Sequence, residues 1–183
     1  MIALGAWGWR HSGWVGAFYP EELPEEWRLT FYANEYEVVG LRADDWLKPE
    51  LDSLRGWVND TREGFLFVLE LPEALPADVD ERLAILTPRL GGLLAGEGEP
   101  VGLDRFAPIW PVSGAAHNLV EALEVDRPPL ALLEAGKLDL RAARLALESL
   151  GGRGDAIILL DDGPELLERL SALRTLRDLL GWQ

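Results

Sequence analysis

The stretch GFLFVLEL, from Gly64 to Leu71, predicts a buried β-strand. Phe65, Phe67 and Val68 favour extended backbone, and the run lacks the polar alternation of a strand with one face in water. Pro72 ends the strand because proline has no N–H to donate to a sheet. A strand that is apolar on both faces must be covered on both, which favours an α/β fold.

Strands and helices alternate on either side of this stretch. The further strands are expected at residues 2–7, 37–41, 100–103, 130–133 and 156–160. The helices are expected at residues 24–36, 49–58, 78–90, 115–123, 138–150 and 164–180. Gly91 and Gly92 are interpreted as the end of the third helix, and residues 106–114 as an irregular connection. Six strand–helix units with short connections predict a largely parallel sheet.

Length and composition indicate one domain. The 183 residues, 48% apolar and 27% charged, are typical of a single globular α/β domain over residues 1–183. No cysteine is present, so neither a disulfide nor a thiolate metal site can form. The chain has no basic leader with an apolar run after it, and no run of about 18 apolar residues. We therefore expect a cytoplasmic protein that does not associate with membranes.

The charge of the chain bears on its partners. The 32 acidic residues outnumber 17 basic ones, which gives a net charge of −15. Duplex-binding proteins gain most of their affinity by neutralising phosphates with lysine and arginine. The lysines here are Lys48 and Lys137 alone. We therefore expect no nucleic-acid partner.

The first third of the chain carries a series of aromatic and glycine motifs. In order, they are Gly5-Ala6-Trp7-Gly8-Trp9, then Trp14 and Gly16, Phe18-Tyr19-Pro20, Leu23-Pro24, and Tyr32-Ala33. These motifs and the strand closed by Pro72 resemble the YecE-like family, a TIM-barrel domain of unknown function. The resemblance is confined mainly to residues 2–72. Together with six strand–helix units in place of eight, it implies an incomplete or modified TIM-like (β/α) barrel with about six parallel strands.

The chain departs from the family at polar positions. The family has Glu-Ile-Asn at the end of its second strand, where this chain has Gly40-Leu41-Arg42. It has lysine late in the third strand, where this chain has Glu70. The later motifs of the family find no counterpart, and family chains are longer. The resemblance therefore implies a shortened, divergent member that lacks the polar site of the family.

Sites in such barrels lie at the carboxyl ends of the strands. The residues expected there form a candidate pocket: Trp9, Arg10, His11, Arg42, Asp44, Asp45, Trp46, Glu70, Asp104, Glu134 and Asp161. Carboxylates near a histidine can support acid–base chemistry. The alternative is that strand ends are acidic because loops are solvated.

Two further features have competing explanations. Eight tryptophans could line a stacking pocket, with Trp9 and Trp46 as its platform, or could pack the core, which we favour. A magnesium site from Asp104, Glu134 and Asp161 is conceivable, but their spacing does not demand one. Zinc is disfavoured because His11 and His117 are the histidines of the chain. We predict no metal and no cofactor.

The function itself stays unknown from sequence, and so does whether the protein is an enzyme. Our main hypothesis is a degenerate barrel that binds a small molecule or a protein partner without catalysis. The alternative is an enzyme with a reshaped carboxylate and tryptophan site, a hydrolase or isomerase acting on a carbohydrate or phosphosugar. An incomplete barrel leaves sheet edges, so we expect a homodimer, with residues 106–114 as an alternative cover.

Overall fold

The computed structural model describes residues 1–96, 102–111, 119–120, 130–151, 155–163 and 165–182. The chain divides into two compact units. One is Gly8–Ser113, and the other joins Met1–Trp7 to Gly114–Gln183. Each has its own set of paired strands. The single domain over residues 1–183 stays a prediction.

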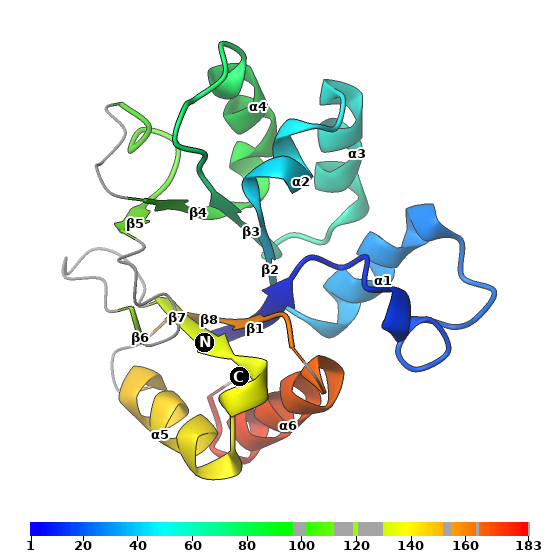
Figure 1. Ribbon diagram of the computed structural model, residues 1–183, viewed down its shortest axis with the longest axis vertical. Coiled ribbons are helices and arrows are strands. Elements are labelled where there is room, and N and C mark those ends of the chain that lie inside the picture. Colours follow the sequence, from blue (N-terminus) through cyan, green and yellow to red (C-terminus); the bar gives the residue numbers. More distant parts are fainter. Residues whose placement is uncertain (97–101, 112–118, 121–129, 152–154, 164, 183) are drawn as a thin grey trace. The chain divides into compact units, whose positions relative to one another are not determined.

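The Gly8–Ser113 unit contains a parallel sheet (Figure 1). Its strands are β2 (Val38–Leu41), β3 (Leu66–Glu70), β4 (Leu90–Ala95) and β5 (Ile109–Pro111). They pair in the order β5-β4-β3-β2, and each pair is parallel. The helices are α1 (Arg28–Glu35), α2 (Ala43–Leu47), α3 (Leu51–Asp60) and α4 (Val79–Leu86). Short 3-10 turns lie at Ser12–Trp14, Glu25–Trp27 and Thr87–Arg89.

Aromatic packing anchors the long connection between Gly8 and α1. Trp14 stacks on Tyr32 of α1, with ring centroids 6.0 Å apart and planes within 8°. The Tyr32 hydroxyl donates a 2.9 Å hydrogen bond to the main-chain oxygen of Val38 in β2. Phe18 meets Phe31 edge to face at 5.2 Å. Aromatic rings therefore pack the connection against α1, and Tyr32 ties α1 to the start of β2.

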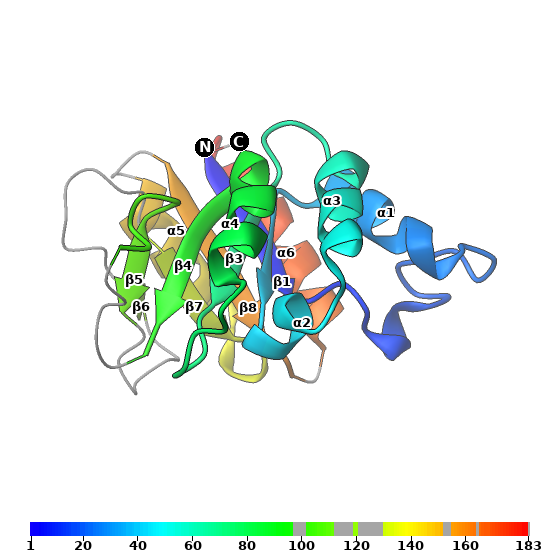
Figure 2. The same cartoon turned by 90° about the horizontal axis from the view of Figure 1, so that it is seen from above.

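The second unit is built around the first strand of the chain. β1 (Ile2–Trp7) pairs in parallel with β8 (Ala156–Asp161), which pairs in parallel with β7 (Leu130–Glu134). The short β6 (Leu119–Val120) pairs with β7 in antiparallel fashion. A 3-10 turn at Ala135–Lys137 precedes α5 (Leu140–Gly151), and α6 (Leu166–Leu179) follows β8. Figures 1 and 2 show α5 and α6 side by side.

The two ends of the chain meet in this unit (Figure 2). The N–H of Ile2 donates a 3.2 Å hydrogen bond to the oxygen of Trp182. Arg177 of α6, whose side chain is buried, donates through Nη1 to the oxygen of Ile2 at 3.0 Å. The terminal ammonium of Met1 lies 2.7 Å from a carboxylate oxygen of Asp155. The C-terminal segment is therefore hydrogen-bonded to the start of the first strand, and the Met1–Asp155 ion pair lies just before β8.

The α/β class and the parallel pairing are confirmed. Seven of the described strands take part in parallel pairs, one fewer than the eight of a complete (β/α) barrel. An incomplete barrel was expected, and the count of parallel strands exceeds the predicted six by one. The continuous apolar runs of β1 and β8 are buried, as predicted for strands covered on both faces.

Several element assignments were wrong. Leu90, Gly91 and Gly92 belong to β4 and do not end a helix, and Leu103 does not lie in a strand. Ile109–Pro111, expected to be irregular, forms β5. Leu119–Val120 is a strand and not part of a helix, and the rest of the predicted helix at 115–123 lies outside the described residues. The short helix α2 was not predicted.

Candidate functional site

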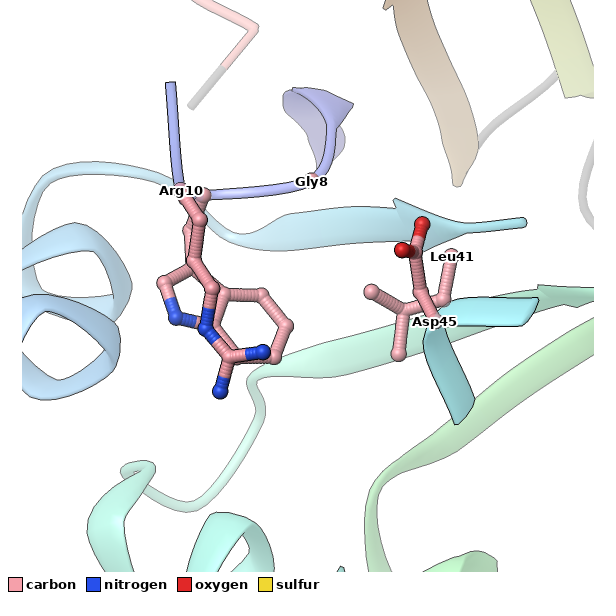
Figure 3. A pocket seen from close by; sticks show the side chains of 5 residues that line it. Gly8, Arg10, Leu41 and Asp45 are labelled. Atoms are coloured by element: carbon pink, nitrogen blue, oxygen red, sulfur yellow. The ribbon is translucent and has the colours of Figure 1, made fainter. Parts of the chain in front are cut away.

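A shallow pocket lies in the Gly8–Ser113 unit. It is lined by Gly8, Trp9, Arg10, Leu41 and Asp45, and its cavity volume is about 50 Å³. Gly8 to Arg10 follow β1 in sequence, Leu41 ends β2, and Asp45 comes from α2. These are the strand-end positions at which α/β barrels place their sites. Figure 3 shows Arg10 and Asp45 on opposite sides of the view.

Gly8 gives the pocket a wall without a side chain. Its φ of 69° lies in the left-handed region that glycine tolerates best. Its N–H donates a 2.8 Å hydrogen bond to the oxygen of Gly40, which ties the connection to β2. A Cβ atom at Gly8 would meet only the His11 ring, at 3.9 Å. The space beside Gly8 is therefore open to a ligand.

Trp9 is fixed by its backbone and by its ring. The buried Tyr19 hydroxyl donates a 2.6 Å hydrogen bond to the main-chain oxygen of Trp9. The Trp9 ring meets Trp57 edge to face at 5.0 Å, and the residue is only 4% exposed. Packing therefore accounts for most of its surface.

Arg10 lies over this aromatic pair. Its guanidinium carbon is 4.9 Å from the Trp9 ring centroid and 5.9 Å from that of Trp57. Its Nε is 3.9 Å from a carboxylate oxygen of Glu25, a long contact between two exposed groups. A cation over an indole face is attracted by the ring quadrupole. The same contact covers the ring, so a sugar could stack on Trp9 only by displacing Arg10.

Asp45 is held by the turn into α2. The Arg42 N–H donates to Asp45 Oδ2 at 3.3 Å, and the Asp45 N–H donates to the Arg42 oxygen at 2.9 Å. The end of α2 is clamped by Arg82 of α4, whose Nη1 donates to the oxygens of Trp46 at 3.2 Å and Pro49 at 2.7 Å. A short helix is thereby positioned by tertiary hydrogen bonds.

Glu70 at the end of β3 is already paired. Arg42 Nη1 lies 3.4 Å from Glu70 Oε1, and both side chains are partly exposed. The indole N–H of the buried Trp46 donates 2.9 Å to the main-chain oxygen of Glu70. The register that aligns Leu41 with Leu69 places Arg42 beside Glu70. Glu70 thus belongs to an ion pair at the end of the sheet and does not line the pocket.

Residues 3–87 match the family model described as “Protein of unknown function DUF72”. All five pocket residues fall inside this segment. Among solved structures, a DUF72 family protein from Thermotoga maritima aligns with a TM-score of 0.58 and 13% identity over 99% of each chain. A DUF72 family protein from Enterococcus faecalis aligns with a TM-score of 0.62 and 12% identity, covering 100% of this chain and 98% of the other. At such identities the likeness shows a shared fold alone. Among curated proteins, none matches the chain.

The predicted site residues within the DUF72 segment separate into three groups. Trp9, Arg10 and Asp45 meet at the pocket. Arg42, Trp46 and Glu70 form the neighbouring ion-pair network. His11 packs beside Trp14, with ring centroids 4.3 Å apart, and Asp44 is paired on the surface with Lys48 at 2.7 Å.

The remaining candidates lie beyond the DUF72 segment. Asp104 is exposed in the connection between β4 and β5. Glu134 and Asp161 belong to the other unit, where they are register partners across β7 and β8. Over the described residues, no three His, Cys, Asp or Glu side chains gather in a way that could hold a metal ion. Over the same residues, no helix is long and apolar enough to span a bilayer.

Two pocket residues, Gly8 and Leu41, were missed by the sequence analysis. Neither carries a group with obvious chemistry, so a search for titratable side chains passes over them. The available signal was their position, because Gly8 follows the first strand directly and Leu41 is the last residue of the second. Strand-end position therefore predicts pocket walls as well as pocket chemistry.

Proposed function

We propose that the chain is a divergent YecE-like protein of the DUF72 type that binds a small polar molecule and does not transform it. The binding site is the pocket between Arg10 and Asp45. The observation that carries the proposal is the pairing of these two unlike charges with an open glycine wall at a strand-end pocket. The DUF72 description assigns no activity, so these side chains are what supports a binding role.

The titratable groups of the pocket favour binding over catalysis. A guanidinium group offers five hydrogen-bond donors and no acceptor, so Arg10 suits the binding of an anionic group better than the acceptance of a proton. Asp45 is the one carboxylate among the lining residues, so the pocket does not offer a pair of groups that could divide the acid and base roles. Glu70, the nearest alternative from the sequence, is engaged by Arg42.

The departures from the YecE-like pattern support the same proposal. The resemblance implies a glutamate at the position of Gly40 and a lysine at that of Glu70. Here the positive charge beside the end of β3 comes from Arg42, which forms an ion pair instead of facing the pocket. The alignments with solved DUF72 proteins run over 99% and 98% of those chains, so they do not support the expected shortening, which stays a prediction.

A thermal-shift screen of a metabolite panel tests the proposal, with the parent chain, Arg10→Ala and Asp45→Ala compared. A ligand at 100 times its Kd stabilises the folded state by about 2.7 kcal/mol, which raises the melting temperature measurably. Arg55→Ala and Asp52→Ala are the matched controls, because these residues form an exposed ion pair on α3 away from the pocket.

We expect at least one compound to stabilise the parent and the controls but neither pocket variant. The proposed binding site is wrong if ligands stabilise the pocket variants as much as the parent, or if no compound in the panel stabilises the protein. Product analysis of the bound compound completes the screen. Turnover that disappears in Asp45→Asn would overturn the non-catalytic half of the proposal.

A second candidate is a carbohydrate hydrolase or isomerase, favoured by the register pairing of Glu134 with Asp161. Register partners on neighbouring strands point to the same face and lie about 4.8 Å apart at the backbone. Retaining glycosidases hold two carboxyl groups about 5 Å apart. Glycoside turnover that is lost in Glu134→Gln and retained in Asp45→Ala would select this candidate over the first.

A further inference from the structure

We propose that the ligand of this pocket is a small zwitterion, with its anionic group at Arg10 and its ammonium group at Asp45. The inference rests on the proposed function, because it names the chemical class that the same pocket would bind. It follows from which hydrogen-bonding groups of the two side chains are already used and which are not.

Arg10 has hydrogen-bond donors that the described part of the protein does not use. Its side chain is 53% exposed, and its ionic contact is the 3.9 Å approach of Nε to Glu25. Within the described residues, its two terminal nitrogens donate no hydrogen bond to the protein. The rings of Trp9 and Trp57 lie against the guanidinium and leave its N–H groups, which lie in the guanidinium plane, for a ligand. A planar fork of this kind matches a carboxylate in a bidentate geometry.

Asp45 has a carboxylate oxygen that accepts no hydrogen bond from the described residues. Its Oδ2 accepts the Arg42 N–H at 3.3 Å, while Oδ1 has no partner in the part of the chain that the structure describes. An ionised carboxylate can only accept hydrogen bonds, so it calls for a donor, and an ammonium group satisfies it best. In the described residues Arg10 and Asp45 form no ion pair with each other. Each charge is therefore left for a group of opposite sign on a ligand.

The remaining walls add no charge. Gly8 and Leu41 are neutral, and the cavity volume of about 50 Å³ is far below the range of about 300–1,000 Å³ typical of sites for drug-sized ligands. A small dianion would place one end against Asp45, and a diamine would place one end against Arg10. Such like-charge contacts reject the wrong ligand. The net charge of −15 also repels anions at long range, whereas a zwitterion carries no net charge.

The experiment uses unbranched ω-amino carboxylates from glycine to 6-aminohexanoate as a molecular ruler. Propionate and propylamine serve as singly charged probes. Isothermal titration calorimetry measures each Kd at pH 7 and low salt. We expect one chain length to bind at least about tenfold more tightly than either singly charged probe, which corresponds to about 1.4 kcal/mol.

Variants separate the two ends of the ligand. Arg10→Ala should reduce the affinity for the best zwitterion to that for propylamine, and Asp45→Ala should reduce it to that for propionate. Arg10→Gln and Asp45→Asn repeat the test with less change of volume. Arg55→Ala and Asp52→Ala, on the exposed ion pair of α3, should bind like the parent.

Equal affinity for a zwitterion and a singly charged probe would overturn the inference, as would equal losses in the control variants. A panel compound of another class that depends on Arg10 and Asp45, with no zwitterion binding, would overturn the inference and leave the proposed function standing. Binding by no compound of either set would overturn both.

Discussion

The buried hydroxyl of Tyr19 donates a 2.6 Å hydrogen bond to the main-chain oxygen of Trp9. This bond joins an aromatic cluster, which packs against α1, to the segment that supplies one wall of the pocket. The position of Arg10 therefore depends on a tyrosine that does not touch the pocket.

Tyr19→Phe should weaken both folding and binding. The substitution keeps the ring and leaves a buried carbonyl without its donor, which costs about 1–3 kcal/mol of the free energy of unfolding. Urea denaturation measures this loss, and calorimetry with the best pocket ligand should show a weaker Kd. Tyr32→Phe is the matched control, because it also removes a buried bond to a main-chain oxygen, that of Val38. Tyr32→Phe should lower stability alone; an equal loss of binding in the two variants would contradict a positioning role for Tyr19.

The stability of the parent chain should also depend on Tyr19 at alkaline pH. Burial raises the pKa of the Tyr19 hydroxyl above its ordinary value, and the nearby Arg28 opposes this shift only in part. Because the folded state holds the proton more strongly, the contribution is fully present below about pH 10, the pKa of an unfolded tyrosine. It is lost as the pH rises beyond that. Urea titrations from pH 7 to 11 should show the advantage of the parent over Tyr19→Phe shrinking above pH 10, and a constant difference would contradict this.

Arg82→Met should loosen α2. Arg82 is 11% exposed at its side chain and donates to Trp46, Pro49 and Asp78. Methionine keeps much of the apolar contact but leaves two main-chain oxygens unsatisfied, at a cost of about 1–3 kcal/mol each if they stay buried. Denaturation should show the loss, and ligand affinity should fall because Asp45 precedes Trp46 in the same helix. Arg55→Met, at a half-exposed arginine, should change the unfolding free energy by less than about 1 kcal/mol. Similar losses of unfolding free energy in Arg82→Met and Arg55→Met would show that the Arg82 hydrogen bonds do not stabilise α2.

Two glycine-to-alanine substitutions should change the free energy of unfolding in opposite directions. A methyl group at Gly92 in β4 would overlap the six-membered ring of the buried Trp110 in β5, whereas Gly56 in α3 has nothing within 4 Å of an added Cβ. Gly92→Ala should lower the free energy of unfolding by about 1–3 kcal/mol or more, since the ring has to move. Gly56→Ala should raise it by about 0.5–1 kcal/mol, because glycine inside a helix is entropically costly. Thermal and urea unfolding measure both, and a stabilising Gly92→Ala would show that the Trp110 contact is not tight.

The same contact explains why β4 was not predicted from sequence. β3 and β8 are uninterrupted apolar runs, so their burial is evident from a few neighbouring residues. The sequence of β4, LGGLLA, shows two glycines at the end of a helical pattern, and local rules treat such a pair as a stop. The reason for Gly92 is the Trp110 ring, which comes from the next strand. A constraint that lies elsewhere in the chain leaves no local signal.

The candidate site, like the strands, was predictable from sequence only in part. Strand-end reasoning selected Trp9, Arg10 and Asp45, because parallel strands bring their carboxyl ends to one edge. It also selected Glu70, whose pairing with Arg42 depends on the register between β2 and β3. Residue types alone do not fix that register. Strand-end position therefore selected three of the pocket residues, but it did not show which of the other candidates pair with each other or lie away from the pocket.

The pairing of β1 with β8 sets an order for folding during synthesis. Ile2 aligns with Ala156, so the first strand leaves the ribosome long before its partner exists. The pairs β2–β3, β3–β4 and β4–β5 all lie within the Gly8–Ser113 unit, so they can form while the chain is still being translated. β1 is apolar and must wait for this partner, which leaves the edge that β8 covers exposed to premature association until β8 is made. A circular permutant that begins at residue 8 and carries residues 1–7 after the C-terminus, through a short glycine–serine linker, would remove this delay because Ile2 and Trp182 are already hydrogen-bonded.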